Sequence, residues 1–254
     1  MKYNMAETFP IPIPDRLPLR VDPSPTVSAI FEARFVSPEP WATLPGLLYA
    51  RIREKYPEQK NLPLAQVPEE FRRQDAALQY LPLLQFLSKD FLVQLGPRVV
   101  SLVTKPNTYP GWPAIRQELA WVVAQVKSAG FVGETERLGV RYVDFFAGDV
   151  LPGLRMHLQV NDQPLLGAPT DVTTLLRRGP MAIRLRVTNG AISATEQGPK
   201  LGSVLELDAW FGPPDVDLFE NGLTRFGEAH DTIKGIFFGL LKPELLTKLN
   251  PVYA

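Results

Sequence analysis

Two long stretches of the chain carry apolar residues at helical spacing, and each follows a group of strand-like segments. The first stretch begins at Pro113 and ends at Gly130, and the second runs from about Asp217 to Leu241. Proline suits the first position of a helix and glycine the residue after its end. An apolar stripe on one side of a helix is buried against another element, here a sheet. This pattern predicts an α+β fold.

The same kinds of strand-like segment, a single strand and a hairpin, precede each of the two long helices. Alternating apolar residues predict strands over 28–36, 136–146 and 204–211. A hairpin is predicted before each helix, 91–95 with 99–104 and 182–187 with 191–195, the second around Asn189-Gly190. Each half therefore shows a strand, a hairpin and a long helix. We predict an antiparallel sheet built from two similar halves, 27–133 and 134–254, within a single domain, 27–254, with helices packed on one face. Further helices are predicted over 44–56 and 69–80.

The start of the chain is rich in proline, with six prolines before residue 26. Proline fixes its backbone angle and lacks an N–H, so this segment cannot be helical. Residues 1–26 are therefore predicted to form an extended arm that lies on the body of the protein or reaches a partner. The alternative is a poorly ordered leader.

Composition excludes several classes of protein. The chain has 254 residues, no cysteine and two histidines, so disulfides and cysteine-ligated metal sites are ruled out, and we expect no bound metal or cofactor. Lys plus Arg equals Asp plus Glu at 27 each, whereas general nucleic-acid binders carry a basic excess. No apolar run is long enough to span a membrane, and no signal-peptide pattern is seen, so we expect a cytoplasmic protein.

Charged residues gather on one predicted face of the sheet. Residues two apart on a strand share a face, so Arg184 lies with Arg186, and Glu206 lies with Asp208 and Trp210. If these strands pair, an ion ladder results. The same face gains Glu32, Arg34, Arg137 and Arg141. One interpretation is a self-neutralised solvated surface. The other is a polar groove whose arginines recognise carboxylate, phosphate or an RNA backbone.

The last predicted helix has one polar interruption in its apolar stripe. His230 falls on the stripe between Phe226 and Ile233, and Phe237 lies near its centre. We interpret His230 as a half-buried structural histidine rather than a catalytic base, because no partner for a catalytic triad is evident from spacing. Gly235 and Gly239 are predicted to permit the close approach of this helix to a strand.

Several segments resemble one known family in their order and spacing. They are Val27–Phe35, Tyr109–Trp112, Arg137–Asp144 and the region of His230, Ile236–Phe238 and Leu245-Leu246. Together they resemble the prokaryotic family called "sporadically distributed protein", in which the position of Asp144 is more often asparagine. The resemblance implies no particular activity. The patchy distribution of that family resembles that of genes on mobile or defence islands.

These observations favour a binding or interaction module over an enzyme. No catalytic residue is predicted, and the candidate binding residues are Arg34, Arg141, Arg184, Arg186, Glu206, Asp208 and Trp210. The expected partner is another protein or a second copy of the chain, within a bacterial multi-protein system. The alternative is an enzyme that acts on nucleic acid or nucleotides through the arginine face, with Glu206 and Asp208 binding magnesium.

Overall fold

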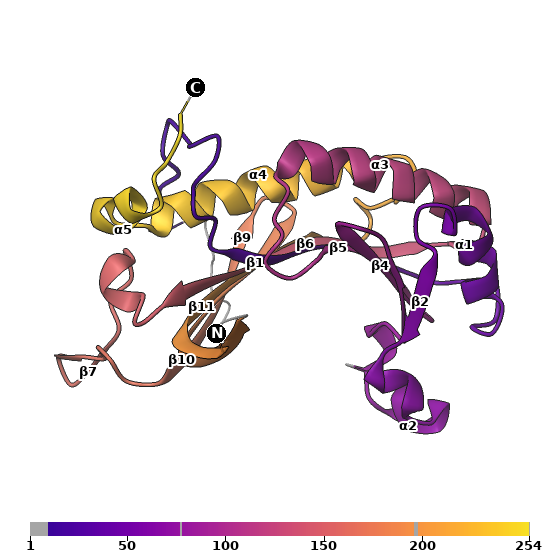
Figure 1. Ribbon diagram of the computed structural model, residues 1–254, viewed down its shortest axis with the longest axis horizontal. Coiled ribbons are helices and arrows are strands. Elements are labelled where there is room, and N and C mark those ends of the chain that lie inside the picture. The colour runs from indigo at the N-terminus through magenta and orange to yellow at the C-terminus, as the bar shows by residue number, and fades with distance from the viewer. Residues whose placement is uncertain (1–9, 77, 196–197, 254) are drawn as a thin grey trace. The chain divides into compact units, whose positions relative to one another are not determined.

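The structure is a computed structural model that describes residues 10–76, 78–195 and 198–253 (Figure 1). The chain divides into two compact units. Unit 1 comprises the described parts of 1–27, 142–209 and 230–254, and unit 2 comprises 28–141 and 210–229. No helix among the described residues is long and apolar enough to cross a membrane.

The fold is α+β, with an open antiparallel sheet of nine strands and helices packed against it, as the sequence predicts. Hydrogen-bonded neighbours follow the order β2-β3-β4-β5-β1-β6-β11-β10-β9. The strands are β1 (Thr26–Phe35), β2 (Glu58–Asn61), β3 (Leu84–Leu87), β4 (Phe91–Gly96), β5 (Val99–Thr104), β6 (Thr135–Ala147), β9 (Thr170–Arg178), β10 (Met181–Thr195) and β11 (Gly198–Phe211), and a separate pair is β7 (Gln159–Val160) with β8 (Gln163–Pro164).

Along the chain, the helices lie between groups of strands and after the last strand (Figure 1). They are α1 (Leu44–Ile52), α2 (Glu69–Gln74), α3 (Trp112–Ala129), α4 (Gly222–Leu240) and α5 (Pro243–Lys248), with 3-10 turns η1 (Pro63–Gln66), η2 (Leu78–Tyr80) and η3 (Leu151–Gly153). The predicted helix from Pro113 to Gly130 is confirmed as α3, and Gly130 caps it in the left-handed conformation.

Unit 2 is built around the β4–β5 hairpin and α3. The hairpin is confirmed, with Phe91 opposite Thr104 and Gly96 opposite Val99. Phe31 of β1 stacks on Trp112 at the start of α3, with ring centres 5.7 Å apart, and meets Phe226 edge-on. Aromatic pairs of this kind add about 0.5–1.5 kcal/mol to the burial of their area. They fix β1 under α3.

A buried carboxylate joins α3 to the segment after α1. Glu118 of α3 accepts hydrogen bonds from the Tyr56 hydroxyl, at 2.7 Å, and from Lys55. Burial and the neighbouring Glu118 raise the pKa of Tyr56. The charge of Glu118 is therefore satisfied by a structural contact, and α1 lies beside α3 (Figure 1).

In unit 1 the second half of α4 packs on β6. Phe146 stacks on Phe237, with ring centres 6.4 Å apart, and the Tyr142 hydroxyl lies 2.8 Å from Nδ1 of His230. Burial lowers the pKa of His230 to about 4. His230 is thus a neutral, hydrogen-bonded residue of the core, which supports the structural interpretation.

The proline-rich arm lies on the body of unit 1 over the residues that the structure describes, 10–26. Its backbone pairs with the end of the chain, since Leu19 N donates to Val252 O at 2.7 Å and Asp22 N donates to Leu249 O at 2.8 Å. It also crosses α4 at Gly235, where the side chain of Ile13 lies close, and at Gly239, where the backbone of Pro12 lies close. The two glycines therefore admit a close neighbour, but that neighbour is the arm and not the predicted strand. Residues 1–9 of the predicted arm lie outside the described residues.

Gly239→Ala should release the arm from α4. A methyl group at Gly239 would lie 2.2 Å from the carbonyl oxygen of Pro12, which is closer than any real contact. We expect trypsin to cleave after Arg16 and Arg20 faster in this variant than in the wild type. The matched control is Gly227→Ala, which has open space and should stabilise α4 by up to ~1 kcal/mol with unchanged cleavage. Equal cleavage of the two variants would contradict the contact.

Two predicted elements are wrong in detail. The Asn189-Gly190 pair does not turn a hairpin, because β10 continues through it, with Gly190 at φ +80° beside Pro169. The Asn189 side chain accepts from Ser203 and donates to Ala168 instead of shaping a turn. The predicted helix over 69–80 is broken at Asp75, whose backbone is extended, so α2 is separate from η2.

The predicted helix from Asp217 is correct only from Gly222 onward. The Oδ1 atom of Asp217 accepts hydrogen bonds from the backbone N–H groups of Phe219 and Glu220, which holds a turn before α4. Leu223, placed on the apolar stripe by its spacing, is 40% exposed.

Candidate functional site

The predicted ion ladder in unit 1 is confirmed for Arg184. One terminal nitrogen of Arg184 lies 3.0 Å from Asp208 and 3.3 Å from Glu206. Arg186 reaches the other way, to Asp171 on β9, with Nε 2.9 Å from Oδ1. The hydrogen bond from Arg186 lowers the pKa of Asp171. The sequence missed Asp171 because it predicted no strand there.

This arrangement does not support the magnesium alternative. Glu206 and Asp208 meet an arginine, whereas a magnesium site needs converging carboxylate oxygens. Within residues 10–76, 78–195 and 198–253, no group of three His, Cys, Asp or Glu side chains could hold a metal ion.

Arg184→Ala and Arg186→Ala should differ sharply in their effect on stability. Asp208 is 6% exposed, so removing Arg184 takes a cationic hydrogen-bond donor away from a buried carboxylate, at a cost of about 1–3 kcal/mol. Arg186 and Asp171 are both on the surface, and such pairs contribute little. We expect a clear fall in Tm for Arg184→Ala and almost none for Arg186→Ala. A similar Tm in both variants would show that Asp208 is satisfied without Arg184.

A second cluster lies in unit 2 and contains four more residues of the predicted charged face: Glu32, Arg34, Arg137 and Trp210. Nε of Arg34 lies 2.8 Å from Glu32, and Arg137 bonds the same carboxylate oxygen. The guanidinium of Arg137 covers the half-buried ring of Trp210, 4.9 Å from its centre. Trp210 therefore projects away from the core, as its parity predicts. Arg141 lies further along β6, half-buried, on the face of the strand that carries Arg137.

The cluster continues through Tyr80 to the hairpin turn. The centre of the Tyr80 ring lies 4.6 Å from the guanidinium carbon of Arg34 and 5.0 Å from the guanidinium carbon of Arg98. Burial, and then the nearby charge of Glu136, raise the pKa of Tyr80. We call the set Trp210, Arg137, Glu32, Arg34, Tyr80 and Arg98 the arginine–aromatic row. The sequence missed Tyr80 and Arg98 because both lie in turns, where periodicity gives no direction.

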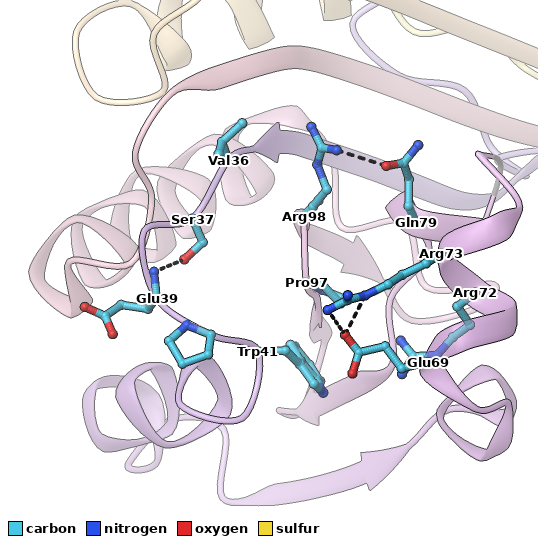
Figure 2. Close-up of a pocket in the computed structure, with 11 residues that line it drawn as sticks. Val36, Ser37, Glu39, Trp41, Glu69, Arg72, Arg73, Gln79, Pro97 and Arg98 are labelled. Carbon is cyan, nitrogen blue, oxygen red and sulfur yellow. Dashed lines mark hydrogen bonds and ion pairs between the residues drawn. The ribbon is translucent and has the colours of Figure 1, made fainter.

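Arg98 connects this row to a surface hollow of about 470 Å³ (Figure 2). Arg98 donates to Gln79 at 2.9 Å and pairs with Glu136, while its buried Nε has no hydrogen-bond partner within the part of the chain that the structure describes. The walls come from the loop after β1, from α2 and from the hairpin turn. The lining residues are Val36, Ser37, Glu39, Pro40, Trp41, Glu69, Arg72, Arg73, Gln79, Pro97 and Arg98.

The hollow combines cations with one large aromatic ring. Figure 2 shows Trp41 beside Glu69 and Arg73, which form an ion pair at 2.6 Å. Arg72 differs from Arg73 and Arg98, because its Nε donates to the carbonyl oxygen of Val67 and no carboxylate pairs with it among the described residues. The terminal nitrogens of Arg72 are therefore available to an acceptor from outside.

Neither the known protein families nor the curated proteins give a match to this chain.

Proposed function

We propose that this protein is a non-catalytic binding module and that the hollow, with the adjoining arginine–aromatic row, receives an acidic segment of a protein partner. The carrying observation is Arg72, a cation that no carboxylate of the described residues pairs with and that lines, together with Trp41, a hollow of about 470 Å³. A volume in this range accommodates a few side chains. A guanidinium binds a carboxylate through two parallel hydrogen bonds, which gives both affinity and direction.

The charges around the hollow favour separate carboxylates over a nucleic-acid backbone. Glu39 and Glu69 line the hollow together with three arginines, and Glu32 and Glu136 lie in or beside the row. A continuous phosphate backbone would meet these carboxylates, and the chain has no net positive charge. Aromatic and arginine side chains are enriched where protein partners bind.

The test is the binding of a fluorescently labelled hexaglutamate peptide, followed by fluorescence anisotropy at low salt. Wild-type protein should bind the peptide saturably, and Arg72→Ala should bind at least about tenfold more weakly, equivalent to ~1.4 kcal/mol. The matched control is Arg51→Ala, which removes an exposed arginine from α1 in the same unit. Circular dichroism should show that both variants keep their fold.

Two results would contradict this function. One is the absence of saturable binding to the wild-type protein. The other is an equal loss of affinity in Arg72→Ala and Arg51→Ala, which would show attraction by overall charge instead of a site.

We further propose that the fold arose from two similar halves, 27–133 and 134–254. In the strand order, β2-β3-β4-β5-β1 is followed by β6-β11-β10-β9. Each half therefore contributes its first strand to the middle of the order and consecutive strands outward from it, and β2 is an additional strand at the outer end of the first half. In each half the long helix, α3 or α4, follows the strands. The resemblance described above supports a place in a cytoplasmic bacterial multi-protein system.

A further inference from the structure

One edge of the sheet is long, regular and free of proline. β9 is the last strand in the order and pairs with β10 through nine consecutive residues, Thr170 to Arg178. By contrast, the other edge strand, β2, has four residues, two of them Glu58 and Lys60. Edges are usually protected by shortness, charge, proline or a bulge. β2 is both short and charged, whereas β9 is long and unbroken, and its charges, on Asp171, Arg177 and Arg178, are of both signs and can meet opposite charges on a partner strand.

The outer side of β9 offers backbone hydrogen bonds in a fixed geometry. Alternate residues of an antiparallel strand direct their N–H and C=O groups to opposite sides, so about half of these groups in β9 face away from β10. Gly179 at φ +55° followed by Pro180 forms the tight turn into β10. This turn and the unbroken register hold β9 extended.

We propose that β9 pairs antiparallel with β9 of a second copy of this chain, about a two-fold axis at Thr174. In such a pair, two residues that face each other must have the same backbone orientation, so the register centres on a residue and not between two. Centring on Thr174 uses the whole strand. Other centres leave one end of the strand without a partner.

This register matches opposite charges and apolar side chains. Asp171 meets the partner's Arg177, and Arg177 is exposed with no ion pair among the described residues. The carboxylate of Asp171 has acceptor sites beyond those that Arg186 uses. On the same face, Thr173 meets the partner's Leu175. In the single chain, the side chain of Leu175 is 66% exposed. On the other face, Val172 meets the partner's Leu176.

Sedimentation velocity over a concentration series tests the proposal. We expect the wild-type protein to be dimeric, and the double variant Thr173→Lys with Leu175→Lys to be monomeric, because four lysines would face one another near the axis. Leu166→Lys changes an equally exposed leucine outside β9 and should remain dimeric. A wild-type monomer at every concentration would overturn the proposal, and so would a dimer in the double variant.

A single cysteine tests the register itself. The chain has no cysteine, so Thr174→Cys introduces the only thiol. At the axis this residue faces its own copy, within the range of Cα separations that a disulfide spans. Mild oxidation should yield a covalent dimer of Thr174→Cys and little of Leu166→Cys. Equal amounts of covalent dimer in the two variants would refute the register. This outcome is independent of peptide binding at the hollow in unit 2.

Discussion

Phe237→Ala should lower the free energy of unfolding by about 3–5 kcal/mol. The side chain is 8% exposed, stacks on Phe146 and meets Phe238 edge-on with ring centres 5.0 Å apart. Its removal leaves a cavity between α4 and β6 that the surrounding rings cannot fill. Urea unfolding, followed by circular dichroism, measures the change.

Leu223→Ala is the matched control on the same helix. Sequence spacing places both residues on one apolar stripe, but Leu223 is 40% exposed and its truncation should cost much less than that of Phe237. Similar losses in the two variants would show that the whole stripe is covered, for example by a partner.

Asp144→Asn should stabilise the protein strongly at neutral and alkaline pH. Asp144 of β6 is 3% exposed, and its Oδ1 accepts a hydrogen bond from the Thr26 hydroxyl at 2.7 Å. Burial raises the pKa of Asp144 to about 7, and this hydrogen bond only partly offsets the effect. Asparagine keeps the shape and the acceptor atom without a charge.

The sign of the effect follows from proton binding. Between pH 4 and 7 the folded chain holds a proton on Asp144 that the unfolded chain has lost, so the free energy of unfolding falls as the pH rises through this range. Three pH units at ~1.4 kcal/mol each give roughly 4 kcal/mol. Asp144→Asn should therefore gain about this amount at pH 8 and almost nothing at pH 4.

His230 contributes a second pH dependence of stability, which the variant Asp144→Asn should reveal. Its pKa is lowered by burial to about 4, so the unfolded chain binds a proton between pH 6.5 and 4 that the folded chain does not. This contribution to stability is complete above pH 6.5 and is lost as the pH falls. In the wild type it opposes the slope from Asp144. In Asp144→Asn the opposing slope from Asp144 is absent, so the free energy of unfolding should rise from pH 4 to 6.5 because of His230.

Urea unfolding at pH 4, 6 and 8 tests both slopes. Asp162→Asn removes an exposed carboxylate and serves as the control, with no comparable gain at pH 8. A variant Asp144→Asn that matches the wild type at pH 8 would show that water or a rearrangement stabilises the ionised carboxylate.

Local patterns were sufficient to predict much of the fold. The end of α3 was predicted correctly because Gly130 adopts the left-handed conformation that glycine favours. The β4–β5 hairpin was predicted correctly because a short break, Gly96-Pro97-Arg98, separates two strand-like runs. The same reasoning failed at Gly190, where the glycine conformation occurs within a strand that continues. A glycine therefore indicates an unusual backbone angle, but the packing around it decides whether the chain turns.

The candidate site was predictable only where it lies on strands. Parity placed Arg184 with Glu206 and Asp208 correctly. Arg72 and Arg98 could not be found in this way, because one lies on a six-residue helix and the other in a turn, and their meeting depends on chain segments far apart in the sequence.

The pairing of the arm with the end of the chain has a consequence for folding during synthesis. The Asn250 side chain donates to Asp22 O, a contact across 228 positions, and unit 1 draws on three separate stretches of the chain. Unit 2 likewise needs residues 210–229 as well as 28–141. Unit 2 is incomplete until residues 210–229 have been made, and unit 1 is incomplete until residues 230–254 have been made. The apolar strands β4 and β5 are made early and therefore lack part of the packing of unit 2 until residues 210–229 follow. A chaperone that shields these strands would raise the yield of folded protein.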